Sequence, residues 1–80
     1  MARRKAKDIE KISAKVGQRI KELRLEAGYT SAEDFSNDNE LNRVQYWRIE
    51  SGTANITLNT LLLVLEVHKI SISDFFSSLS

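Results

Sequence analysis

The sequence predicts an all-α fold, a compact domain of five helices, and three observations lead to this prediction. The 80 residues include no proline and three glycines, so few positions interrupt a helix. Apolar residues recur at spacings of three and four, which is typical of one helix face. A hydrophobic content of 41%, with charged residues interspersed, suits a chain large enough for one core.

The first predicted helix runs from about Ile9 to Ala27 and has one apolar stripe. The stripe consists of Ile9, Ile12, Val16, Ile20 and Leu23. A single stripe predicts that one face of the helix packs on the core. Gly28 follows directly, and glycine readily adopts the left-handed conformation that ends a helix.

The second predicted helix is short and covers about 32 to 37. Ser31 precedes it and Asp34 follows three residues later, which is the spacing of a capping box. The polar run SNDNE then predicts a turn. Within this run, Asn39 is the residue that best tolerates a left-handed backbone.

The third predicted helix begins after Asn42, a good N-cap residue, and extends to about Glu50 before Gly52 ends it. The faces of this third helix have different chemistry. At about 100° per residue, Tyr46 and Ile49 fall on one side of it. The opposite arc carries Arg43, Val44, Trp47 and Arg48. We therefore expect the first side to pack on the core and the second to face outward. Arginines can bind guanine and an apolar surface can contact a thymine methyl, so this arc suits the major groove of DNA.

The fourth predicted helix, capped by Thr57, covers 58 to about 67 and is apolar nearly all round. One face carries Leu58, Leu61, Leu62 and Leu65, and the other carries Leu63, Val64 and Val67. Such a helix is expected in the middle of the structure or partly beneath a partner subunit. The alternative for the Leu63 and Val67 side is the core of a monomer.

The fifth predicted helix opens at Ile72, where Ser71 and Asp74 repeat the capping-box spacing. The alternation in KISISDFF would also suit a strand, but a lone strand would have no pairing partner. We expect Phe75 to fill the core.

Charge is distributed unevenly along the chain, although the net charge is only +1. Residues 1–24 hold nine Lys or Arg and three Asp or Glu, a net +6, whereas 25–80 hold three and eight, a net −5. The cationic region is either a phosphate-facing surface or a solvated tail. We divide the chain into 1–10, a basic arm or an extension of the first helix, and 11–80, the folded domain.

Several function classes are not expected. The chain has no cysteine, a single histidine (His68) and no glycine-rich phosphate loop. His68 is expected near a helix end, where a cation would be favoured. The acidic residues show no metal-ligand spacing, so we expect neither an enzyme nor a metal or other cofactor. No apolar run approaches the roughly 20 residues of a membrane span, and the basic start lacks the apolar stretch of a secretory signal, so a cytoplasmic protein is expected.

The order of these helices, from about Val16 to Phe76, resembles the phage repressor and Cro-type (XRE-like) helix-turn-helix family. The shared markers are Arg24 near the end of the first helix and the close of the third, formed by Ile49, Glu50 and Gly52. The resemblance implies a lambda-repressor-like domain in which the second and third helices form the helix-turn-helix. It also implies an ion pair between Arg24 and Glu50.

The family's roles imply a sequence-specific transcriptional regulator that binds double-stranded DNA as a homodimer on a palindromic operator. Base contacts would come from Arg43, Val44, Trp47 and Arg48. Phosphate contacts would come from Ser31, Asn42, Gln45, Thr53 and Asn55. The dimer interface would include Phe76 and Leu79. No small-molecule ligand is expected.

Three departures from the family pattern concern the second helix and its surroundings. Ser36 stands where a small Ala is usual, and Glu40 stands where the turn usually has Gly. The turn must therefore differ locally, or Asn39 must take the left-handed conformation. The loop before the second helix is also about one residue longer than the common form.

Two alternatives concern function. The single-domain layout is also similar to restriction-modification controller proteins, a narrower possibility within the same class. Trp47 and Val44 beside Arg43 would equally suit a protein-interaction module, such as an antitoxin or an adaptor. Binding that weakens steeply with salt would indicate DNA, because phosphate contacts release counterions.

Overall fold

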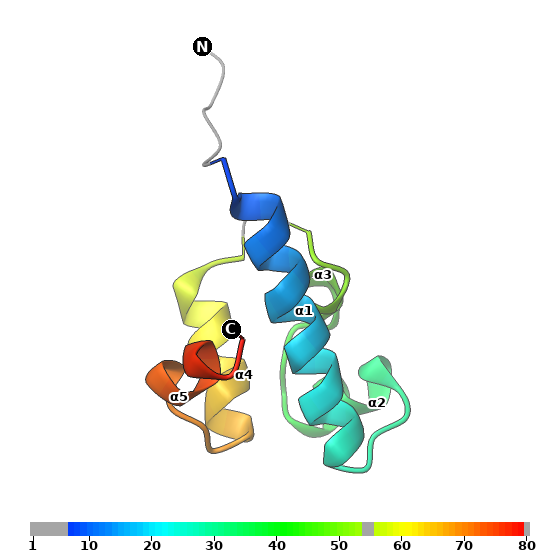
Figure 1. Ribbon diagram of the computed structural model, residues 1–80. Helices are drawn as coiled ribbons and strands as arrows, with labels where there is room; N and C mark the ends of the chain where they lie inside the picture. The colour runs from blue at the N-terminus through cyan, green and yellow to red at the C-terminus, as the bar shows by residue number, and fades with distance from the viewer. Residues whose placement is uncertain (1–6, 54–55, 80) are drawn as a thin grey trace.

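A computed structural model of the chain describes residues 7–53 and 56–79, and the described residues form five helices and no strand. The helices are α1 (Ile9–Glu26), α2 (Ala32–Asp38), α3 (Arg43–Glu50), α4 (Leu58–Val67) and α5 (Ile72–Ser77) (Figure 1). The all-α, five-helix prediction is confirmed. Every helix boundary that the sequence predicted lies within about one residue of the observed one. Residues 9 and 10, predicted to be part of an arm or of an extension of the first helix, belong to α1.

Four helices begin with a side-chain cap, at the four positions that the sequence predicted. The capping oxygen accepts a hydrogen bond from the backbone N–H three residues later in each case. The pairs are Ser31 with Asp34 (3.2 Å), Asn42 with Gln45 (2.9 Å), Thr57 with Thr60 (3.1 Å) and Ser71 with Asp74 (3.0 Å). Each cap satisfies a backbone donor that the first helical turn would otherwise leave unpaired.

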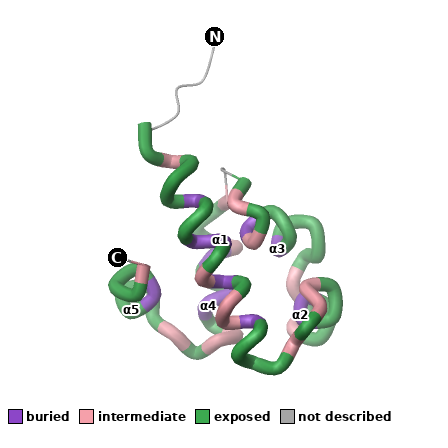
Figure 2. Tube along the Cα trace, turned by 45° about the vertical axis from the view of Figure 1, so that its right-hand side comes forward, coloured by how far each residue is buried: buried purple, intermediate pink, exposed green. Residues whose placement is uncertain are grey.

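Helix α1 is the longest element, and in the view of Figure 1 α2 and α3 lie to one side of it and α4 and α5 to the other. The buried positions of the tube lie where the helices face one another (Figure 2). The core residues are Val16, Ile20, Phe35, Tyr46, Ile49, Leu61, Val64, Leu65 and Phe75. Every helix contributes to this core, so the orientation of α3 is tied to the whole domain.

Helix α4 is buried on one face only, so it does not lie in the middle of the structure, while the alternative of an outer face beneath a partner subunit stays a prediction. Leu62 and Leu63 are 39% and 44% exposed, and Leu58 is 63% exposed. Val67 packs against the edge of the core, which fits the monomer-core alternative, whereas Leu63 does not. The reason is tertiary, because α4 turns only Leu61, Val64 and Leu65 into the core and no described element covers its other side.

The sequence left two alternatives for the turn between α2 and α3, a locally different turn or a left-handed Asn39, and the second is wrong. Asn39 has φ −106°, and its side-chain amide donates to the backbone oxygen of Phe35 at 2.8 Å. Glu40 takes the left-handed conformation instead, with φ 56°. The N–H of Leu41 then donates to the oxygen of Ser36 at 2.8 Å, which is the helix-ending pattern that needs a left-handed residue at this position.

Replacing Glu40 with glycine should therefore stabilise the protein by about 1 kcal/mol, because glycine has no Cβ to clash in the left-handed region. Asn39→Gly should destabilise it, because that residue has negative φ and a bonded side chain. Chemical denaturation of both variants measures the free energy of unfolding. Two changes of the same sign would contradict this account of the turn.

His68 lies at the C-terminal end of α4, as expected, but it does not favour a cation. Its ring stacks on Phe35, with centroids 5.1 Å apart and an interplanar angle of 8°. Nε2 is buried and has no hydrogen-bond partner among the described residues. Burial lowers the pKa of His68, the charge of Arg19 lowers it further, and Glu26 partly opposes both. The fold therefore favours the neutral imidazole.

This shift predicts that stability declines in mild acid. Because the folded-state pKa of His68 is lowered, the unfolded chain takes up the proton first as the pH falls. The free energy of unfolding should be highest above about pH 6.5, the ordinary pKa of histidine, and should fall below it. Denaturation at several pH values should show a smaller decline for His68→Gln than for the wild type. An equal decline of the free energy of unfolding in both proteins would show that His68 does not cause the loss of stability in acid.

Candidate nucleic-acid interface

Helix α3 has one buried side and one exposed side, as its sequence predicted. Tyr46 and Ile49 are each 1% exposed and belong to the core. On the other side Val44 is 55% exposed and Trp47 is 60% exposed, and Arg43 and Arg48 are exposed as well. The four side chains predicted to contact bases therefore lie on the free surface of one short helix.

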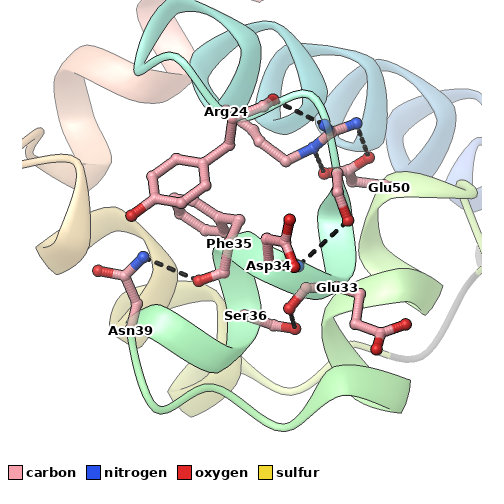
Figure 3. A network of polar contacts seen from close by, with 9 residues as sticks. Arg24, Glu33, Asp34, Phe35, Ser36, Asn39 and Glu50 are labelled. Carbon is pink, nitrogen blue, oxygen red and sulfur yellow. Dashed lines mark hydrogen bonds and ion pairs between the residues drawn. The ribbon is translucent and has the colours of Figure 1, made fainter.

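The C-terminal end of α3 is joined to α1 by the Arg24–Glu50 ion pair, which the family resemblance implied. Arg24 Nε donates to one carboxylate oxygen of Glu50 at 2.7 Å, and Nη2 donates to the other at 3.1 Å (Figure 3). The remaining Nη1 donates to the backbone oxygen of Tyr29 at 2.9 Å. Arg24 is 5% exposed, and the hydrogen bond with Glu50 raises its pKa. One buried guanidinium thus ties together α1, the loop before α2 and the end of α3.

Tyr46 lies beside this pair with its hydroxyl buried. Burial raises the pKa of Tyr46, and the Glu50 carboxylate raises it further. The centroid of its ring lies 5.1 Å from the ring centroid of Phe35 on α2. Tyr46 is therefore a neutral core residue that holds α3 against α2, and not a reactive group.

Gly17 brings α1 and α3 into backbone contact, which the sequence reasoning missed. A Cβ at this position would meet the backbone oxygen of Ile49, and it would lie 2.8 Å from that of Glu50. The available signal was a glycine inside a predicted helix, where it costs about 1 kcal/mol relative to alanine. The close approach explains why glycine stands there and sets how α3 lies on the domain.

The predicted phosphate-binding residues lie at the starts of α2 and α3 and after α3. Asn42, Gln45 and Thr53 are exposed, and Ser31 is partly exposed. The oxygens of Ser31 and Asn42 are used as caps. Gln45 Oε1 accepts from Thr60 at 3.4 Å, which leaves its amide nitrogen as the donor. Asn55 lies outside the described residues.

A shallow groove separates the exposed side of α3 from the start of α2. It is lined by Ala32, Glu33, Arg43, Val44 and Trp47. Glu33, which the sequence reasoning did not single out, places Oε1 at 3.3 Å from Nη1 of Arg43. Arg43 thus contacts an acid, but the acid belongs to α2 and both side chains remain about 60% exposed.

The residues predicted for a dimer interface differ in exposure. Phe75 is fully buried, as expected, while Phe76 is 41% exposed. Leu79 is only partly exposed and packs against the core. Phe76 adjoins two other exposed apolar side chains, Ile12 of α1 and Leu58 of α4, in one groove. Three helices therefore form an apolar surface on which Phe76 is accessible.

Within residues 7–53 and 56–79, no group of three or more His, Cys, Asp or Glu side chains is placed to hold a metal ion. None of the helices in that part of the chain has both the length and the apolar character needed to cross a bilayer. Of the predicted arm at 1–10, residues 1–6 lie outside the described residues.

Comparison of the chain with protein-family models, curated proteins and solved structures gave no match. Any assignment of function therefore depends on the residues of the chain itself.

Proposed function

We propose that this protein is a sequence-specific DNA-binding transcriptional regulator that reads the major groove with α3. The supporting observation is the exposed arc of Arg43, Val44, Trp47 and Arg48 on a helix whose opposite side is buried. In this proposal α2 and α3 act as a helix-turn-helix, with α3 as the recognition helix. The buried pair of Arg24 and Glu50 keeps the recognition helix in a fixed orientation.

The exposed arc has the chemistry that base recognition requires. Arg43 and Arg48 each offer paired donors to the O6 and N7 acceptors of guanine. Val44 and Trp47 offer an apolar surface to thymine methyl groups. Asn42, Gln45 and Ser31 stand at helix N-termini, where backbone N–H groups and the helix dipole favour phosphate. Thr53 and Asn55 would add phosphate contacts after α3.

One such domain reads only a few base pairs, so we propose a homodimer on a palindromic operator, with half-sites about one helical turn apart. The apolar surface around Phe76 is the proposed interface, with Leu79 at its edge. The protein would act in the cytoplasm by occupying its site, without a small-molecule ligand. A restriction-modification controller is a narrower form of this proposal.

Phe76→Ser should weaken dimerisation without unfolding the domain, because the side chain is 41% exposed. Sedimentation over a range of concentrations should show the wild type associating and the variant remaining monomeric at the same concentration. Leu63→Ser, at an equally exposed position on α4, reports whether the outer side of that helix takes part. If the wild type stayed monomeric even with operator DNA, the proposed homodimer would be refuted.

The function is tested by selecting binding sites from random-sequence DNA and titrating the selected site over a range of salt concentrations. The wild type should enrich a palindrome and bind it with a steep salt dependence. Arg43→Ala and Arg48→Ala should each weaken binding by about tenfold and relax the preference at one base pair. Arg19→Ala is the control, because it removes an equal charge that is paired with Glu22 on α1. Failure to enrich any sequence would refute the proposal.

A protein-interaction module, such as an antitoxin or an adaptor, is the second candidate. The observation that favours it is a 60% exposed Trp47 beside an apolar groove, since exposed tryptophans with arginine are typical of protein hot spots. The acidic residues of α2 also suit a protein partner better than phosphate. A contact anchored on Trp47 should change little with salt, whereas DNA binding should weaken steeply.

A further inference from the structure

Glu33 is the acidic side chain that adjoins the exposed arc of α3. It belongs to the first turn of α2, and its carboxylate lies 3.3 Å from the guanidinium of Arg43. The carboxylate points away from Asp34 and from the Arg24–Glu50 pair (Figure 3). Asp38, the third acid of α2, instead accepts a hydrogen bond from the hydroxyl of Tyr29 at 2.9 Å. Glu33 is therefore the α2 acid that a ligand of α3 would meet.

Stability does not account for this ion pair. Both side chains are about 60% exposed, and exposed ion pairs contribute little to folding. A carboxylate beside a base-reading helix also repels the phosphates of DNA. A hydrogen-bond donor on the DNA that met this carboxylate would offset the repulsion.

A G·C base pair offers such a donor in the right order. Its major-groove edge presents two acceptors on guanine, N7 and O6, followed by the amino group of cytosine. Arginine matches the guanine acceptors and a carboxylate matches the cytosine amino group. Arg43 has five N–H donors, so the contact of Nη1 with Glu33 leaves others for guanine. The ion pair thus holds a donor group and an acceptor group side by side, as this base pair requires.

We propose that Glu33 and Arg43 together read one G·C base pair, with Glu33 accepting a hydrogen bond from the cytosine N4 amino group. This inference rests on the proposed function and adds Glu33 as a specificity residue from α2. An A·T pair keeps the N7 acceptor but presents the adenine amino group to Arg43 in place of guanine O6, and it presents the thymine oxygen O4 to Glu33, so each side chain loses a matched partner. Glu33 therefore increases discrimination against A·T beyond what Arg43 provides alone.

The test compares Glu33→Gln with Asp34→Asn on the selected operator. Both changes remove one negative charge from the first turn of α2, so both should raise affinity for unrelated DNA to a similar extent. The base pair read by Arg43 is first located as the position that Arg43→Ala relaxes. At that position, only Glu33→Gln should reduce the preference for G·C over A·T, by about tenfold.

A modified operator provides an independent readout. Placing N4-methylcytosine in that base pair keeps its pairing with guanine but puts a methyl group where Glu33 would bind. The modification should weaken wild-type binding by about tenfold and should have little effect on Glu33→Ala. Equal base preferences in the two α2 variants, or an equal effect of the methyl group on wild type and Glu33→Ala, would overturn the role of Glu33. Selection of no sequence by the wild type would instead refute the proposed function, and this inference with it.

Discussion

Glu50→Ala should lower the free energy of unfolding by about 3 kcal/mol, because it leaves the buried guanidinium of Arg24 without its carboxylate partner. The side chains of Arg24 and Glu50 are 6% and 10% exposed, so water replaces the lost partner only poorly. The end of α3 would also lose its attachment to α1. If the proposed function holds, the variant should also bind DNA more weakly at temperatures where it remains folded.

Chemical denaturation gives the change in stability, and titration of the selected operator gives the change in binding. Glu22→Ala is the control, because it breaks a more accessible pair with Arg19, whose side chains are 25% and 46% exposed, and should cost less than about 1 kcal/mol. Similar denaturation midpoints for the two variants would show that the buried pair does not hold α3 to α1. Unchanged operator binding by Glu50→Ala would show that the pair does not orient the helix.

Gly17→Ala should destabilise the protein by about 2 kcal/mol, although the same change usually stabilises a helix. The added Cβ would meet the backbone oxygens of Ile49 and Glu50, and backbone atoms cannot move aside as a flexible side chain can. Helix α1 and helix α3 would have to separate. A loss of stability where an alanine usually adds stability would therefore be direct evidence of the backbone contact.

Thermal and chemical denaturation measure this effect. Gln18→Ala, at the next and exposed position of α1, should change the free energy of unfolding by less than about 0.5 kcal/mol. A Gly17→Ala variant more stable than the wild type would mean that α1 and α3 do not approach so closely.

The sequence predicted the local structure well because the responsible interactions lie within a few residues. A cap such as Ser31 bonds to the N–H of Asp34, three positions along the chain. The two sides of α3 follow from helical periodicity, which places Tyr46 and Ile49 opposite Trp47. These features needed no knowledge of the remaining chain.

The turn after α2 shows where local reasoning was insufficient. Residue preference favoured Asn39 for the left-handed position, but the helix continues through Asp38 and uses Asn39 as its cap. The left-handed position then falls on Glu40. A small difference in where a helix ends thus moved the special conformation by one residue.

The sequence alone predicted an all-helical chain, the residues that cap its helices, most of the helix limits, and an exposed arc of arginine and tryptophan on α3. Only the tertiary structure decided which surfaces meet. It exposed Leu63 on α4, stacked the ring of His68 on Phe35, and brought Gly17 against the backbone of α3. It also placed Glu33 beside Arg43. The physical reason is that periodicity defines the faces of each helix, whereas the packing of all five helices around one core determines which faces touch.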